Sequence, residues 1–324
     1  MLRIPLTHIV LAGAIGLSGA AWCQPYPSRP VRVIVAASAA GGPNAVARIL
    51  GQQLAAQTGQ SFVIDNRPGA NGILGAEMVA KAAPDGYTLL LTTAAFTINP
   101  NIYRKLPFDT LRDFMPVTNI GSAEAMILTV NPALPARSVQ ELIALAAKPE
   151  SRLAYGSPGV GNILHLAGAL FNARAGASMM HVPYKGAGAA ITALIGGEVQ
   201  IMFVTASLGL AQIKAGKLRA LAYNNPARAT FLPEVPTMAE AGVSGMEMDG
   251  SWYGMFAPAH ASREIIARIF GEIRKALDHP RIKEQLAALG VEPLGSTPAA
   301  FRSFVAASIE RFAELVRLAG VEPE

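Results

Sequence analysis

Cysteine is almost absent from this chain, since Cys23 is the only one among 324 residues. One cysteine near the N-terminus excludes a disulfide framework and leaves no thiol pair for redox or metal chemistry. Histidine is scarce too: there are five, and no two lie at the spacing of zinc ligands. A chain of this length can bury a large core without disulfides, and the length suggests two domains. We expect no metal and no cofactor.

Long apolar runs are confined to the N-terminus. Arg3 precedes an uncharged segment at 9–19 (IVLAGAIGLSG), and a polar, proline-rich stretch begins at Gln24. This order is typical of a cleaved secretory signal, and the run is shorter than the roughly 20 residues that span a bilayer. We therefore predict a signal peptide at 1–23 and a periplasmic location. Lipidation of Cys23 is the alternative, although the bulky Trp22 before it disfavours that modification.

Charged residues are sparse and scattered. The net charge is +5 and charged residues make up 15% of the chain, without a basic run interleaved with aromatic residues. This pattern disfavours a nucleic-acid partner. The motifs G-x-G-x-x-G, G-x-x-x-x-G-K-[ST] and G-x-S-x-G do not occur, so the common nucleotide and nucleophile signatures are missing. The sequence favours binding over catalysis, with an α/β enzyme that uses a cleft as the alternative.

Short β-rich segments alternate with helical patterns along the whole chain. Strands are expected at 31–36, 62–64, 88–92, 125–130, 153–156, 179–183, 199–203, 218–222 and 250–256, and helices dominate from 262 to 319. This alternation predicts an α/β fold with mostly parallel sheets flanked by helices. Because no linker-like stretch separates two halves, the chain should cross between two lobes near 121–125 and 243–250. We predict a first lobe at 24–124 and 249–324 and a second lobe at 125–248.

Four loops that follow predicted strands are rich in small residues. They lie at 38–44, 92–97, 156–162 and 184–188, and each opens a predicted helix. Ligands of open α/β sheets bind at the carboxyl ends of strands, and helix N-termini favour anions. Small residues also let a ligand approach backbone N–H groups. For any one loop, ordinary turn chemistry is the alternative; together the loops suit a small carboxylate. His165 follows one loop and either faces the cleft or packs its helix.

Nine short motifs follow one another along the chain in an order that is typical of one protein family. The segments are 31–42 (VRVIVAASAAGG), 65–72 (DNRPGANG), 83–90 (APDGYTLL), 98–100 (INP), 106–109 (LPFD), 181–186 (HVPYKG), 215–220 (AGKLRA), 232–237 (LPEVPT) and 240–242 (EAG). Each is weak alone, but the ordered set covers essentially the whole mature chain. It resembles the extracytoplasmic receptors of tripartite tricarboxylate transporters, the Bug family.

The resemblance implies a two-lobed, type II-like periplasmic-binding-protein (Venus-flytrap) fold that closes on a small carboxylate. Candidate ligand-binding residues carried over by position are Ser38, Ala39, Gly41, Gly42, Asn44, Thr93, Ala94, Ser157, Gly159, Gly161, Asn162, His165, Tyr184, Lys185, Gly186, Ala187 and Thr205. The implied partner is the membrane permease of such a transporter, with a sensor kinase as the alternative. We expect a monomer that binds no nucleic acid.

Two departures from the family pattern bear on the ligand. Asn44 and Ala45 stand where the family often has Thr-Asp, and Val204 to Ala206 stand where it often has an acidic residue followed by Asn. Two acidic positions are therefore lost, which disfavours recognition of an amino group. We expect a plain carboxylate, with an apolar or aromatic body, in preference to an amino acid.

Overall fold

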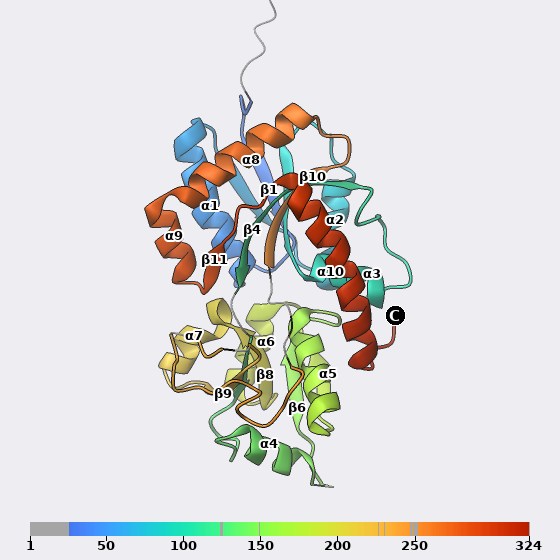
Figure 1. Cartoon of the computed structure of the whole chain (residues 1–324), viewed down its shortest axis with the longest axis vertical. Coiled ribbons are helices and arrows are strands. Elements are labelled where there is room, and N and C mark those ends of the chain that lie inside the picture. The colour runs from blue at the N-terminus through green and yellow to red at the C-terminus, as the bar shows by residue number, and fades with distance from the viewer. Residues whose placement is uncertain are drawn as a thin grey trace, which may run out of the picture.

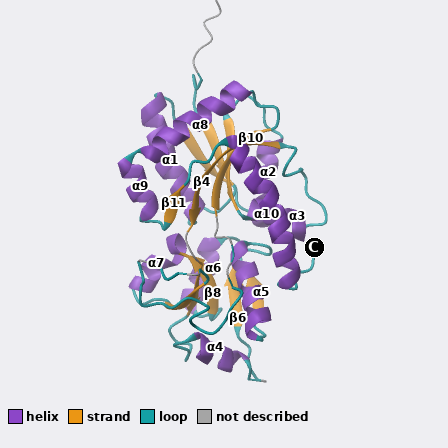
Figure 2. Ribbon diagram, in the orientation of Figure 1, coloured by secondary structure: helices purple, strands orange, loops and turns teal. Residues whose placement is uncertain are grey.

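The computed structural model of the chain has two lobes, and each lobe is a sheet flanked by helices (Figures 1 and 2). The structure describes residues 26–123, 126–148, 150–225, 227–229, 231–246, 248 and 252–323. The predicted signal peptide at 1–23 lies outside the described residues. No described helix combines the length and the hydropathy needed to cross a bilayer.

The first sheet has six strands in the order β11-β4-β10-β3-β1-β2. Their bounds are β1 Val31–Val35, β2 Phe62–Asn66, β3 Thr88–Thr93, β4 Phe114–Ala123, β10 Trp252–Pro258 and β11 Val291–Pro293. Strand β1 pairs parallel with β2 and β3, whereas β10 runs antiparallel between β3 and β4, and β11 antiparallel to β4. The sheet is therefore mixed, and β10 returns to it from late in the chain.

Both faces of this sheet are buried, and alternate side chains enter different clusters. Val33 and Val35 of β1 pack in one cluster with Leu50, while Ile34 packs in the other with Phe256. This alternation follows from the two-residue period of a strand. The helices that cover the sheet are α1 Gly42–Thr58, α2 Ile73–Ala80, α3 Ala95–Ile102, α8 Arg263–Asp278, α9 Pro280–Ala287 and α10 Pro298–Leu318, with a short 3₁₀ turn η1 at Ala70–Gly72.

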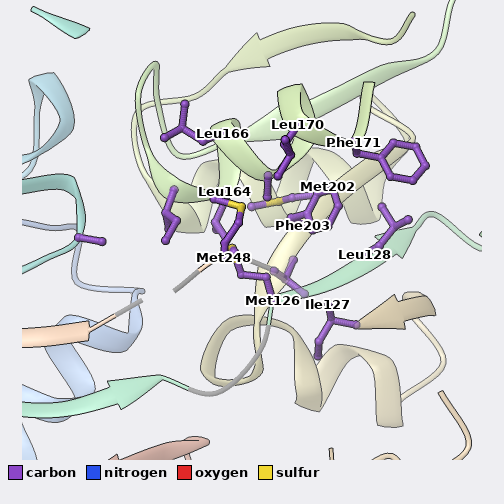
Figure 3. Close-up of a cluster of buried hydrophobic side chains, with 14 of the residues drawn as sticks. Met126, Ile127, Leu128, Leu164, Leu166, Leu170, Phe171, Met202, Phe203 and Met248 are labelled. Carbon is purple, nitrogen blue, oxygen red and sulfur yellow. The ribbon is translucent and has the colours of Figure 1, made fainter. Parts of the chain in front are cut away.

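The second sheet has five strands in the order β7-β6-β8-β5-β9. Its elements are β5 Met126–Val130, α4 Val139–Ala146, β6 Ala154–Ser157, α5 Ile163–Ala175, β7 Met180–Pro183, α6 Ala187–Gly196, β8 Ile201–Thr205, α7 Ala206–Lys214 and β9 Arg219–Tyr223. Strand β6 pairs parallel with β7 and β8, and β5 pairs antiparallel with β8 and β9. Figure 3 shows the core of this lobe, where Leu170 and Phe171 of α5 gather with Met202 and Phe203 of β8 and Leu128 of β5.

The predicted two-lobed α/β architecture is confirmed, and local signals explain much of it. The prediction of mostly parallel sheets is wrong: both sheets are mixed, because β10 and β11 pair antiparallel in the first sheet and β5 pairs antiparallel with both of its neighbours in the second. Ser138 caps α4 by accepting a hydrogen bond from the Glu141 N–H, as the capping-box pattern predicts. Strand β4 was not predicted, because Pro116 and Gly121 interrupt its pattern, and neither was α7. The lobe boundaries stay a prediction, since residues 124, 125, 247 and 249–251 lie outside the described part of the chain.

Candidate functional site

A cavity of about 510 Å³ lies between the two sheets, within the range of small-molecule sites. Its lining residues are Ala36, Ala37, Ser38, Gly41, Gly42, Pro43, Pro68, Gly69, Ala70, Asn71, Gly72, Thr93, Ala95, Tyr103, Pro158, Gly159, Val160, Asn162, Ile163, Leu164, Tyr184, Lys185, Gly186, Ala187, Thr205, Leu208 and Tyr253. Both lobes contribute to this wall, so a ligand here would contact the two lobes at once.

The cavity sits at the carboxyl ends of strands from both sheets. Ser38 follows β1 and Thr93 ends β3, while Pro158 follows β6, Tyr184 follows β7 and Thr205 ends β8. Loops from both lobes thus meet where open α/β sheets bind their ligands. In Figure 1 this region lies between the upper lobe, with α1 and α10, and the lower lobe, with α5 and α7.

Apart from α2, which continues the 3₁₀ turn η1, four helices begin at the cavity wall without a side-chain cap. The N-cap residues Gly41 (α1), Ala94 (α3), Gly186 (α6) and Thr205 (α7) make no side-chain capping hydrogen bond, and no acidic residue occupies the first turn of these helices. The first N–H groups of a helix have no partner within it and carry partial positive charge. Convergence of four such ends on one cavity makes it suited to an anion.

Side-chain charge in the cavity is minimal and positive. Among the described residues that line it, none is Asp or Glu, and Lys185 carries the one full charge. Lys185 is exposed, so its ammonium acts partly through solvent. The buried Tyr253 hydroxyl stays neutral, because burial raises its pKa above the ordinary value. Neutral donors and one cation leave no counter-charge for a ligand ammonium group.

The two lobes touch on one side of the cavity through hydroxyl groups. The Tyr253 hydroxyl of the first lobe lies beside the Ser207 side chain of the second, and Ser207 Oγ lies 3.0 Å from Thr205 Oγ1. Gly42, at the start of α1, is close to this contact: a Cβ there would lie 2.6 Å from both Ser207 Oγ and the Tyr253 hydroxyl oxygen. A hydrogen atom in place of a side chain lets the two helix ends approach.

A second inter-lobe contact lies beside the loop at 158–162. Asn162 Nδ2 donates to Asn71 Oδ1 at 3.5 Å, and Asn71 Nδ2 donates to Asn99 Oδ1 at 2.8 Å. A Cβ on Gly161, whose φ is +70°, would lie 1.5 Å from Ile102 Cδ1 of the other lobe. Direct contacts at two places around the cavity indicate that the lobes are closed on each other.

Eleven of the seventeen residues predicted from the sequence line this cavity. They are Ser38, Gly41, Gly42, Thr93, Gly159, Asn162, Tyr184, Lys185, Gly186, Ala187 and Thr205. The other six, Ala39, Asn44, Ala94, Ser157, Gly161 and His165, are not in its wall. Their role as ligand contacts is a prediction that the cavity geometry does not favour.

Those residues support the wall from behind. Asn44 Nδ2 donates to the Ala39 carbonyl at 2.8 Å and so shapes the loop before α1. Ala94 is fully buried at the start of α3. Ser157 is buried, and its Oγ hydrogen-bonds within its own loop and to a histidine. His165 accepts a hydrogen bond from the Gly161 N–H and does not line the cavity.

Sequence reasoning missed sixteen lining residues, among them Asn71, Tyr103 and Tyr253. The motif at 65–72 forms a cavity loop that was not predicted; its Gly69 and Gly72 have positive φ values and are the available sequence signal for a turn there. Tyr103 follows α3, and Tyr253 lies inside β10. Nothing local to either tyrosine marks it as a cavity residue.

Comparison with known proteins decides the family. Residues 46–321 match the sequence model of a family described as tripartite tricarboxylate transporter family receptor. The chain belongs to this family. The receptor chain is also 34% identical to protein BugT of Bordetella pertussis over 324 residues, covering 99% of each chain. The resemblance inferred from the short motifs is confirmed.

Solved structures extend the comparison to the fold of this receptor. It matches "R. palustris Rpa4515 with adipate" at a TM-score of 0.88 and 33% identity, covering 92% of this chain and 100% of that one. It matches "MatC (Rpa3494) from Rhodopseudomonas palustris with bound malate" at 0.82 and 29% identity, covering 90% and 100%. The periplasmic-binding-protein fold predicted for this chain is therefore confirmed.

Proposed function

We propose that this receptor captures a small carboxylate in the cavity between its lobes. The observation that carries the proposal is the convergence of four uncapped helix N-termini on a cavity with no Asp or Glu among its described lining residues. Backbone N–H groups form strong charge-assisted hydrogen bonds with a carboxylate. The described relatives with adipate and with malate support the same ligand class.

The proposed ligand has no amino group and has an apolar body. An ammonium group would enter the cavity without a counter-charge and would lose its hydration at a cost. Tyr103, Ile163, Leu164 and Leu208 line the cavity and offer apolar surface to a carbon chain or ring. Adipate fits this description better than glutamate does.

Closure supplies the mechanism of capture. A ligand held by loops from both lobes makes its full set of contacts only in the closed form, and therefore shifts the equilibrium toward that form. Contacts such as Asn162 to Asn71 would add to the closed state. The closed protein then presents a surface that differs from the open one, by which a membrane permease would recognise the loaded receptor.

Location and partner form part of the same proposal. We infer export to the periplasm through a signal peptide at 1–23, delivery of the ligand to the permease of a tripartite tricarboxylate transporter, and action as a monomer. The order of a cationic residue, a short apolar run and a polar stretch at the N-terminus supports export. We also propose that the protein releases its ligand chemically unchanged.

The test is titration calorimetry of the mature protein with adipate, malate, benzoate and glutamate, with uncharged adipamide as the matched control. We expect saturable binding of at least one acid without an amino group, weak or no binding of glutamate, and none of adipamide. Mass spectrometry should recover the bound acid intact. Equal binding of adipate and adipamide would refute anion recognition, and tightest binding of glutamate would refute the exclusion of amino acids.

A further inference from the structure

Two stacked imidazoles lie behind the second lobe's part of the cavity wall. His165 of α5 and His181 of β7 have ring centroids 3.8 Å apart and ring planes 17° from parallel. Tyr155 of β6 continues the stack, with its ring 5.0 Å from that of His181. Neither histidine lines the cavity. Three neighbouring elements therefore contribute one ring each to a stack outside the cavity wall, in which Tyr155 and His165 are buried and His181 is half-buried.

The stack is hydrogen-bonded to both ends of the loop at 158–162. His165 Nδ1 accepts from the Gly161 N–H at 3.0 Å. His181 Nε2 lies 2.7 Å from Ser157 Oγ, and that oxygen accepts from the Gly159 N–H at 3.2 Å. Each histidine thus holds one side of the loop, one directly and the other through a serine.

This loop needs support, because its own conformation is permissive. Gly159 has a φ of +150° and Gly161 has a φ of +70°, where other residues are strained. Pro158, Val160 and Asn162 between and beside these glycines line the cavity. Two glycines give the loop many alternative conformations, so hydrogen-bond partners for their N–H groups help to fix one geometry. Backbone bonds from the Asn162 N–H to Gly159 O at 3.2 Å and from the Gly186 N–H to Pro158 O at 3.1 Å act in the same direction.

The imidazoles have the protonation state that this role requires. Burial lowers the pKa of His165 to about 4, and burial together with the neighbouring His165 lowers the pKa of His181 to about 3. Both rings are neutral at pH 7, so His165 Nδ1 keeps the lone pair that accepts from Gly161. The titratable group packed beside them is Tyr155, whose pKa is raised by burial. Within the described part of the chain, no group of three potential metal ligands forms.

We propose that His165 and His181 are positioning residues that hold the loop at 158–162 in its ligand-binding shape. The inference rests on the proposed function of the cavity, since the loop forms part of its wall. His165, which the sequence predicted to contact the ligand, would instead act indirectly by holding a loop that does. The consequence is that ring chemistry, and not merely ring volume, sets the affinity.

Two variants of His165 separate chemistry from volume. His165→Asn places an amide oxygen near the position of Nδ1 and can still accept from Gly161, whereas His165→Phe keeps a stackable ring and removes the acceptor. In the unliganded mature protein, ¹⁵N spectra should show wild-type His165 neutral, with the proton on Nε2. The Gly161 amide should exchange with solvent at least tenfold faster in the Phe variant and within threefold of wild type in the Asn variant.

Calorimetry with adipate at 25 °C, where the folded state of each variant is first verified, supplies the binding result. We expect His165→Phe to raise the Kd at least tenfold and His165→Asn less than threefold. A Phe variant that binds like wild type, or a wild-type His165 with its proton on Nδ1, would overturn the proposal. If wild-type protein bound no acid, the proposed function would fail separately, while the tautomer and the exchange rates would still decide whether the pair fixes the loop.

Discussion

One added methyl group at Gly188 should oppose closure of the lobes. Gly188 lies in the first turn of α6 in the second lobe. A Cβ there would lie 2.9 Å from the Cβ of Ala40, which belongs to the loop after β1 in the first lobe. That separation is too short for two carbon atoms, so the closed form of Gly188→Ala must shift one lobe or one loop. The open form has no such conflict.

Gly188→Ala should therefore stabilise the unliganded protein and destabilise the closed, ligand-bound form. In the unliganded protein, replacing a helical Gly by Ala favours the helix by up to about 1 kcal/mol. In the closed form, overpacking costs about 1–2 kcal/mol, which corresponds to a Kd raised roughly five- to thirtyfold. The assay is thermal unfolding without ligand, followed by calorimetric titration with adipate.

Gly196→Ala is the matched control, because Gly196 ends the same helix and a Cβ there meets no atom within 4 Å. It should share any stabilisation of the helix and bind adipate like wild type. Unchanged affinity in Gly188→Ala would show that the bound state does not have this closed geometry. Equal losses of affinity in both variants would assign the effect to the helix itself and refute the argument from inter-lobe contact.

Two further predictions concern charge. Because the pKa of His165 (about 4) and of His181 (about 3) lie below the ordinary 6.5, the unfolded chain takes up protons between pH 6.5 and 5 that the folded protein does not. The free energy of unfolding should fall as the pH falls through this range, by at most about 1.4 kcal/mol per pH unit for each histidine. Urea unfolding at several pH values measures this slope. If the double variant His165→Asn with His181→Gln kept the same slope, the two histidines would not be its cause. The second prediction is that Lys185→Gln should raise the Kd for adipate about two- to fivefold and reduce the dependence of the Kd on salt, since Lys185 is an exposed cation at the cavity. Calorimetry at two ionic strengths measures both effects. An unchanged salt dependence would speak against a contribution of the Lys185 charge to binding.

Loops with local signals were predictable from the sequence. Ser38, Gly159 and Tyr184 lie in loops between a β-rich segment and a helical pattern, and small residues mark each loop. Such loops meet at one edge whenever neighbouring strands run parallel. All four predicted loops contribute residues to the cavity wall, so this much of the site follows from local sequence patterns.

The remaining parts of the site depend on contacts distant in sequence. Tyr253 reaches the cavity because β10 inserts antiparallel between β3 and β4, a pairing that no local pattern specifies. His165 illustrates a different limit. Its place early in a helix was predictable, but the direction of its ring was not, because that direction follows from the packing of α5 against β6 and β7 and from the hydrogen bond that the ring accepts from the Gly161 N–H.

Anion recognition by backbone groups has a consequence for how specificity can change. The N–H groups in the first turns of α1 and α6 come from the fold itself, and substituting a side chain does not remove them. The side chains of Tyr103, Ile163 and Leu208 can differ without loss of the anion site, and they line the space left for the body of the ligand. The carboxylate class should therefore be robust to substitution, whereas the choice among carboxylates should change with a few cavity side chains.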